Sequence, residues 1–140
     1  MAGLRLHHIG IAVEDVATAT AHYVRLLGCE VKSAVVRDPV QTAYVQFVKM
    51  PGDSVYIEFI APDGNKSKLR NALKKGGGLN HLCYATPDID GSYKHLRGQG
   101  LFPLQPPVPA VAFKGRRIAW FMGADGVPVE LVESALHEEL

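Results

Sequence analysis

Two stretches of the chain begin with alternating apolar residues and continue with apolar residues at helical spacing. In the first, a strand-like run over residues 6–13 leads through Asp15 to Val16 and Tyr23, which share one face of a helix. An aspartate before a helix accepts hydrogen bonds from the first N–H groups, and a glycine such as Gly28 ends a helix in a left-handed conformation. The pattern therefore predicts a strand followed by a capped helix.

The same order returns from Leu79, where a strand-like run is followed by Asp88 and by apolar residues at helical spacing. Further strand-like runs follow each helix. In the first half these are residues 30–36, 42–49 and 54–60, and in the second half they are "RRIAWFM" and "VPVELVE". The remaining run, "PLQPPVP", cannot be a central strand because proline lacks the N–H that a ladder needs.

This internal repeat predicts an α+β fold in which two βαβββ modules are paired. A length of 140 residues fits one domain with a shared core. We expect a first module over about residues 4–62, a linker helix over about 65–76, and a second module over about 78–134.

Each half carries one histidine on its first strand and one glutamate on its last. His8 aligns with His81, and Glu58 aligns with Glu130. Because side chains alternate along a strand, each histidine shares its face with small residues, which leave a concavity. Two imidazoles and two carboxylates are costly to bury without a cation, so the sequence predicts that these four residues bind one divalent metal ion.

The predicted ligands form a donor set of intermediate hardness. It is compatible with Co, Ni, Mn, Zn or Mg and does not decide among them. A six-coordinate ion would keep two open positions, enough for two neighbouring oxygens of a small-molecule substrate.

Composition and charge narrow the classes of partner. The net charge is +1, so there is no general attraction to nucleic acid or to an anionic membrane. No apolar run approaches the roughly 20 residues that span a bilayer, the N-terminus lacks the pattern of a signal peptide, and the two cysteines fit a reducing compartment. These features predict a cytoplasmic protein, and the expected edge strands predict a homodimer.

The segments "HIGIAVEDV", "NHLCYATPDID" and "VPVELVE" resemble the glyoxalase, or vicinal oxygen chelate, superfamily, and in particular its methylmalonyl-CoA epimerase-like members. The resemblance implies two βαβββ modules in a curved mixed sheet with a metal held by the first and last strands of each. It implies proton abstraction next to a carbonyl or thioester, with an acyl-CoA or acyl-carrier thioester as substrate and Glu130 as the proton shuttle.

One departure from the epimerase pattern concerns the second catalytic base. Epimerases carry another glutamate before the third strand, whereas "VVRDPVQTAYVQF" contains none here. Asp38 is the nearest carboxylate and is the candidate for this second catalytic role. The difference leaves a glyoxalase I-type lactoylglutathione lyase, which uses the same four ligands, as the main alternative.

Other functions of the superfamily fit less well. Antibiotic-binding members generally lack the metal ligands, and extradiol dioxygenases use two histidines and only one carboxylate. We interpret the basic segments at 65–75 and 114–117 as solvated surface, with phosphate binding as the alternative. Cys83 is interpreted as a small core residue. The other histidines, which we interpret as structural or exposed, are His7, His22, His95 and His137.

Overall fold

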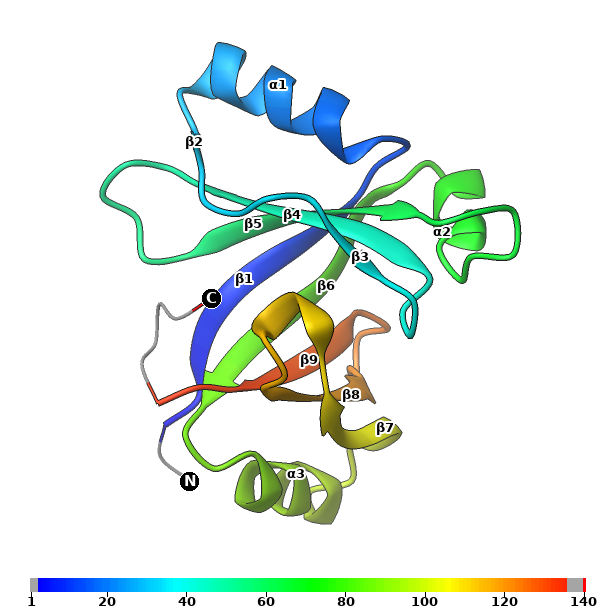
Figure 1. Cartoon of the computed structure of the whole chain (residues 1–140). Coiled ribbons are helices and arrows are strands. Elements are labelled where there is room, and N and C mark those ends of the chain that lie inside the picture. The colour runs from blue at the N-terminus through cyan, green and yellow to red at the C-terminus, as the bar shows by residue number, and fades with distance from the viewer. Residues whose placement is uncertain (1–2, 136–139) are drawn as a thin grey trace. The chain divides into compact units, whose positions relative to one another are not determined.

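The computed structural model describes residues 3–135 and residue 140. The chain divides into two compact units (Figure 1). The central unit is Ile9–Asn80, and the terminal unit joins Met1–His8 to His81–Leu140. The boundaries fall inside strand β1 (Arg5–Ala12) and inside strand β6 (Gly78–Thr86). His137 lies outside the described residues.

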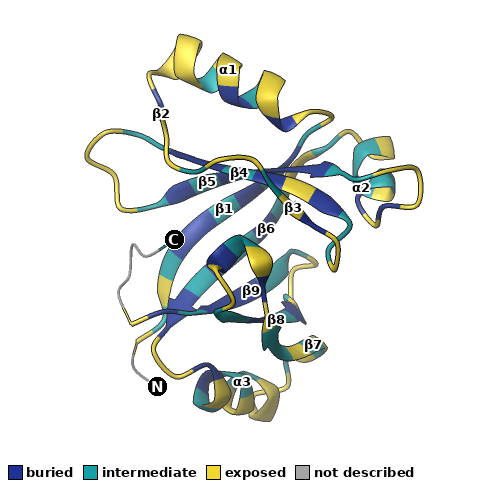
Figure 2. Ribbon diagram, in the orientation of Figure 1, coloured by how far each residue is buried: buried dark blue, intermediate teal, exposed yellow. Residues whose placement is uncertain are grey.

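The central unit is built around an antiparallel group of strands. Strand β4 (Ala43–Lys49) pairs with β2 (Glu30–Val31), β3 (Val36–Asp38) and β5 (Tyr56–Pro62). Helix α1 (Val16–Leu27) packs against β4 and β5, and its outer face is exposed (Figure 2). The core under this helix consists of Val16, Cys29, Val48, Phe59 and Ala61, with Ile11 and Val13 packed beside it.

The predicted ends of α1 are confirmed. The Asp15 carboxylate accepts a hydrogen bond from the Thr18 N–H at 2.9 Å, and Gly28 ends the helix with φ of 77°. The N–H of Gly28 and the neighbouring N–H of Cys29 donate to carbonyls of the last turn, as expected for a left-handed cap.

The terminal unit contains a mixed sheet under one helix. Strand β6 runs parallel to β9 (Pro128–Glu133), while β8 (Arg117–Met122) is antiparallel to β9 and to β7 (Phe102–Pro109). Helix α3 (Ile89–Gly98) begins at Asp88 and packs on β7, β8 and β9. The core between this helix and the sheet consists of Ile89, Ala119, Phe121 and Leu131. A short 3-10 turn, η1 (Val111–Phe113), precedes β8.

One prediction about the strands is confirmed by the structure, and two predicted elements differ from it. The proline-rich run does form a strand, β7, but it lies at the end of the strand order and its register shifts twice. An edge position suits proline because one side of the strand needs no N–H donors. The prediction that the run is no central strand is therefore confirmed.

The strand predicted over 30–36 is split into β2 and β3. Between them the Phe47 N–H donates to the Ser33 hydroxyl at 2.9 Å, and the Gln46 amide donates to the Ser33 carbonyl. The Lys32 N–H still donates to the Phe47 carbonyl at 2.9 Å, so these side-chain hydrogen bonds replace regular pairing over residues 33–35.

The predicted linker helix is shorter than expected, since α2 covers only Arg70–Lys74. Ser67 explains the late start. Its hydroxyl donates to the Thr42 carbonyl at 2.6 Å and accepts from the Leu69 N–H, which holds the preceding residues in a turn. No helix in the described part of the chain is long and apolar enough to cross a membrane.

Candidate metal centre

Three of the four predicted ligands meet inside the terminal unit. The Nε2 atoms of His8 and His81 lie 3.1 Å apart. Oε1 of Glu130 lies 3.2 Å from Nε2 of His8 and 3.4 Å from Nε2 of His81. Both imidazoles are fully buried and Glu130 is 4% exposed. The sequence prediction that these three side chains converge is therefore confirmed.

Strand geometry positions this cluster. On β9, Val129 and Leu131 point into the core under α3, so Glu130 points to the opposite face. The parallel pairing of β6 with β9 places Cys83 opposite Glu130, and His81 is two residues before Cys83 on the same face. His8 reaches the group from β1.

Two aromatic rings surround the imidazoles. Phe113 stacks on His8 with ring centroids 5.9 Å apart, and Trp120 meets His81 edge-on at 4.8 Å. Trp120 is also the direct partner of Glu130 across the β8–β9 pair. The placement of these two rings could not be predicted from local sequence patterns, because it depends on strand register and on the turn at η1.

The electrostatics of the cluster favour a cation. Burial would raise the pKa of Glu130, but the neighbouring His8 and His81 lower it by more, so the carboxylate is charged at neutral pH. Its Oε1 is buried and has no hydrogen-bond partner in the part of the chain that the structure describes. A buried anionic oxygen beside two ring nitrogens is stable only when a positive charge or a proton lies between them.

The distances fit a metal ion. Ligand atoms about 2.1 Å from an ion lie about 3.0 Å apart in neighbouring octahedral positions and about 3.4 Å apart in a tetrahedron. The three observed separations of 3.1, 3.2 and 3.4 Å span this interval. His8, His81 and Glu130 could therefore hold a divalent ion, whose identity the donor set does not decide.

Residues 7–120 match the family model of the Glyoxalase/Bleomycin resistance protein/Dioxygenase superfamily. The chain belongs to this superfamily. The ethylmalonyl-CoA/methylmalonyl-CoA epimerase of Cereibacter sphaeroides is 33% identical over 131 residues, 91% of this chain and 96% of that protein. Human mitochondrial methylmalonyl-CoA epimerase is 30% identical over 134 residues, 93% of this chain and 74% of that protein.

Solved structures agree with this assignment to the glyoxalase superfamily. A methylmalonyl-CoA epimerase in complex with methylmalonyl-CoA and NH4+ superposes with a TM-score of 0.83 at 27% identity, over 99% of this chain and 100% of that one. A variant of Streptomyces coelicolor methylmalonyl-CoA epimerase in complex with 2-nitronate-propionyl-CoA also gives a TM-score of 0.83 at 27% identity, over 96% and 100% of the chains. The predicted fold class and family are both confirmed.

The two remaining predicted site residues of this glyoxalase superfamily member lie in the central unit. Glu58 is 4% exposed on β5, on the same face as Tyr56 and Ile60, as the strand alternation predicts. Asp38 is equally buried, and its Oδ1 accepts hydrogen bonds from the N–H groups of Val40 and Gln41. One oxygen of Asp38 thus stabilises the turn after β3. The roles of Glu58 as a ligand and of Asp38 as a base stay predictions.

The residues interpreted as non-catalytic mostly fit that interpretation. Cys83 is fully buried, and His22 and His95 are exposed. His7 is fully buried and its Nδ1 lies 2.8 Å from Nδ1 of His8, a contact that strand alternation does not predict.

The basic segments are largely surface. The lysines of the segment at 65–75 are exposed. In the segment at 114–117, Arg117 is held by two carboxylates, donating to Asp90 at 2.9 Å and to Glu133 at 2.8 Å. These ion pairs connect α3, β8 and β9, so Arg117 contributes to the fold of the terminal unit.

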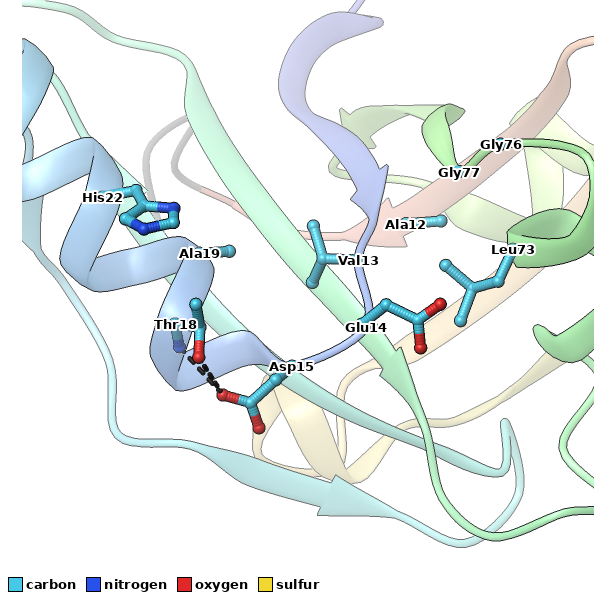
Figure 3. A pocket seen from close by; sticks show the side chains of 10 residues that line it. All are labelled: Ala12, Val13, Glu14, Asp15, Thr18, Ala19, His22, Leu73, Gly76 and Gly77. Carbon is cyan, nitrogen blue, oxygen red and sulfur yellow. Dashed lines mark hydrogen bonds between the residues drawn. The ribbon is translucent and has the colours of Figure 1, made fainter.

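A pocket of about 420 Å³ lies in the central unit, where β1 ends and α1 begins (Figure 3). Glu14, His22, Leu73 and the backbone of Gly76 and Gly77 line it. None of the predicted ligands is in its lining. The Asp15 side chain is engaged in capping α1. The other polar side chains of the lining are those of Glu14, Thr18 and His22.

Proposed function

We propose that the protein is a divalent-metal-dependent enzyme that removes a proton next to the carbonyl of an acyl thioester, with methylmalonyl-CoA as the best candidate substrate. The observation that carries the proposal is the buried triangle formed by Nε2 of His8, Nε2 of His81 and Oε1 of Glu130. The similarity to acyl-CoA epimerases over more than nine-tenths of the chain supports the substrate class.

We further propose Glu58 as the fourth ligand. It is the counterpart of Glu130 in the internal repeat, and it is a buried acidic side chain on the corresponding strand. An ion shared with the three other ligands would balance the negative charge of this buried carboxylate.

When bound, a divalent ion stabilises the negative charge that develops on a carbonyl oxygen as the neighbouring C–H bond breaks. The chain's own residues supply the rest. The two imidazoles, in their neutral form, would each offer the lone pair of Nε2 to the ion. The pKa of Glu130 is lowered, so its carboxylate is ionised at neutral pH, which is the protonation state that a general base requires. The full burial of both imidazoles excludes water from this face of the site and strengthens its electrostatic interactions.

Epimerisation requires proton transfer on both faces of the substrate carbon. Asp38 is the candidate for the second base, although one of its oxygens already accepts two backbone hydrogen bonds. Because this Asp38 oxygen is already engaged, a reaction that needs fewer bases is the second candidate: a glyoxalase I-type lyase that acts on a glutathione hemithioacetal.

Two assays separate these functions. Protein loaded with Co²⁺ is incubated with methylmalonyl-CoA in D₂O, and deuterium at the α-carbon is measured by mass spectrometry. The same preparation is tested with the hemithioacetal of glutathione and methylglyoxal. Deuterium incorporation supports the epimerase, and formation of lactoylglutathione alone supports the lyase. Inactivity on both substrates, together with no bound metal, would favour a small-molecule binding protein.

The same assay tests Asp38. We expect Asp38→Asn, which keeps the oxygen that accepts the turn hydrogen bonds, to slow the interconversion of the two epimers while the protein still exchanges the proton of one epimer. Equal loss of both reactions would argue against Asp38 as the second base.

The basic segment at 65–75 is the candidate binding region for the phosphates of a coenzyme A thioester, because lysine ammonium groups form charge-assisted hydrogen bonds to phosphate. Exposed Lys66, Lys74 and Lys75 are the residues to test. Their replacement by alanine is expected to raise KM for the thioester and to leave kcat unchanged. A homodimer and a cytoplasmic location stay predictions of the sequence.

A further inference from the structure

The histidine that precedes the first ligand is in direct contact with it. Nδ1 of His7 lies 2.8 Å from Nδ1 of His8, and both side chains are fully buried. At this distance the two nitrogens share a hydrogen bond, so one of them carries the proton and the other accepts it.

The direction of this hydrogen bond follows from the other side of the His8 ring. Nε2 of His8 faces Nε2 of His81 and Oε1 of Glu130. A neutral imidazole has one N–H and one lone pair, and a metal ion requires the lone pair. If Nε2 provides the lone pair, the proton of His8 is on Nδ1, and Nδ1 of His7 is the acceptor.

Phe113 holds both rings in this arrangement. It stacks on His8 with an interplanar angle of 22° and meets His7 edge-on at 76°, with centroid distances of 5.9 and 5.8 Å. The Phe113 side chain is itself 1% exposed. Cys83 Sγ lies within 4.8 Å of a ring nitrogen of each histidine, so this side of His8 is closed by protein atoms.

We propose that His7 is a positioning residue for the metal centre: it accepts the Nδ1 proton of His8 and thereby keeps the lone pair of His8 on Nε2. This inference rests on the proposed metal site. Hydrogen bonds of this type to metal-bound histidines typically contribute about 10–100-fold to metal affinity.

The test compares three variants of His7. His7→Asn places an amide oxygen near the position of Nδ1, His7→Gln places its amide near the position of Nε2, and His7→Leu fills similar volume without any acceptor. The dissociation constant for Co²⁺ is measured by calorimetry in the full chain. We expect about a 10–100-fold loss of affinity in His7→Leu and His7→Gln, and a value close to that of the wild type in His7→Asn.

Equal affinities in all four proteins would overturn the proposal, because the acceptor at position 7 would then have no effect on metal binding. An equal loss in all three variants would also overturn it, because the loss would then follow from altered packing and not from the missing acceptor. Long-range ¹H–¹⁵N correlation spectra of the wild type give a second, independent readout that needs no variant. With Zn²⁺ bound, they should show the His8 proton on Nδ1. A proton on Nε2 would contradict the proposal.

His81→Ala separates failure of this inference from failure of the metal site. If the wild type binds Co²⁺ and His81→Ala does not, while His7→Leu retains full affinity, only the role of His7 is wrong. If the wild type binds no more Co²⁺ than His81→Ala, the proposed metal site fails and the role of His7 fails with it.

Discussion

The indole ring of Trp120 meets the imidazole of His81 edge-on, with ring centroids 4.8 Å apart. Trp120 is the only tryptophan of the sequence. Its Nε1–H is buried and has no hydrogen-bond partner among the described residues. The chain therefore contains a natural fluorescent reporter beside a proposed metal ligand.

We expect Co²⁺ to quench the emission of Trp120 saturably, with one ion per chain, because the reporter lies next to His81. A fluorescence titration of the wild type checks this. His81→Ala should abolish the saturable phase, and Trp120→Phe provides the blank. A linear response of the same slope in wild type and His81→Ala would show that the quenching comes from ions in solution.

Phe113 should connect stability to metal affinity, since it packs against both His7 and His8. Phe113→Ala is expected to lower the free energy of unfolding by about 3–5 kcal/mol and also to weaken Co²⁺ binding. Phe121, which is fully buried in the core under α3, is the matched control. Phe121→Ala should cost similar stability and leave the affinity of the folded protein unchanged. Equal effects on affinity would argue against a specific role of Phe113.

Glu130 should be required for proton transfer. Glu130→Gln keeps the shape of the side chain but removes its charge, so α-proton exchange is expected to fall by about 10²–10⁴-fold. Glu133→Gln is the control on the same strand, because Glu133 pairs with Arg117 and has no place in the proposed mechanism. If Glu130→Gln retained the exchange rate of the Glu133→Gln variant, another residue would have to be the base.

The ion pairs of Arg117 should make stability depend on pH in the acid range. Hydrogen bonds from Arg117 lower the pKa values of Asp90 and Glu133 in the folded protein. The unfolded chain therefore binds protons at a higher pH than the folded one, so this stabilisation is present at neutral pH and is lost as the pH falls through the lowered folded values.

Thermal unfolding of the wild type and Arg117→Met at several pH values tests this. The unfolding temperature of the variant should fall less between pH 6 and pH 3, and salt should reduce the difference between the two proteins. Parallel curves would show that these exposed pairs contribute nothing measurable to the pH dependence.

Local patterns in the sequence were sufficient to predict most of the helices and strands. The helix boundaries at Asp15, Gly28 and Asp88 were predictable because capping depends on a few neighbouring residues. The length of α2 was not, because the start of that helix depends on hydrogen bonds between Ser67 and Thr42, which are distant in sequence.

The candidate site was partly predictable from the internal repeat. The internal repeat pointed to His8, His81 and Glu130, since repeated modules place equivalent strand positions on equivalent faces. The contact between His7 and His8 was not predictable, because neighbouring residues of a regular strand point to opposite faces. Phe113, which is distant in the sequence, packs against both rings.

The metal content of the purified protein tests the central claim most directly. Wild type and His81→Ala are purified under identical conditions without chelator, and their divalent ions are measured by mass spectrometry of the elements. We predict close to one ion per chain in the wild type and a small fraction of that in His81→Ala. Equal metal content in the two proteins, with equal thermal stability before and after treatment with chelator, would contradict a metal centre formed by these residues.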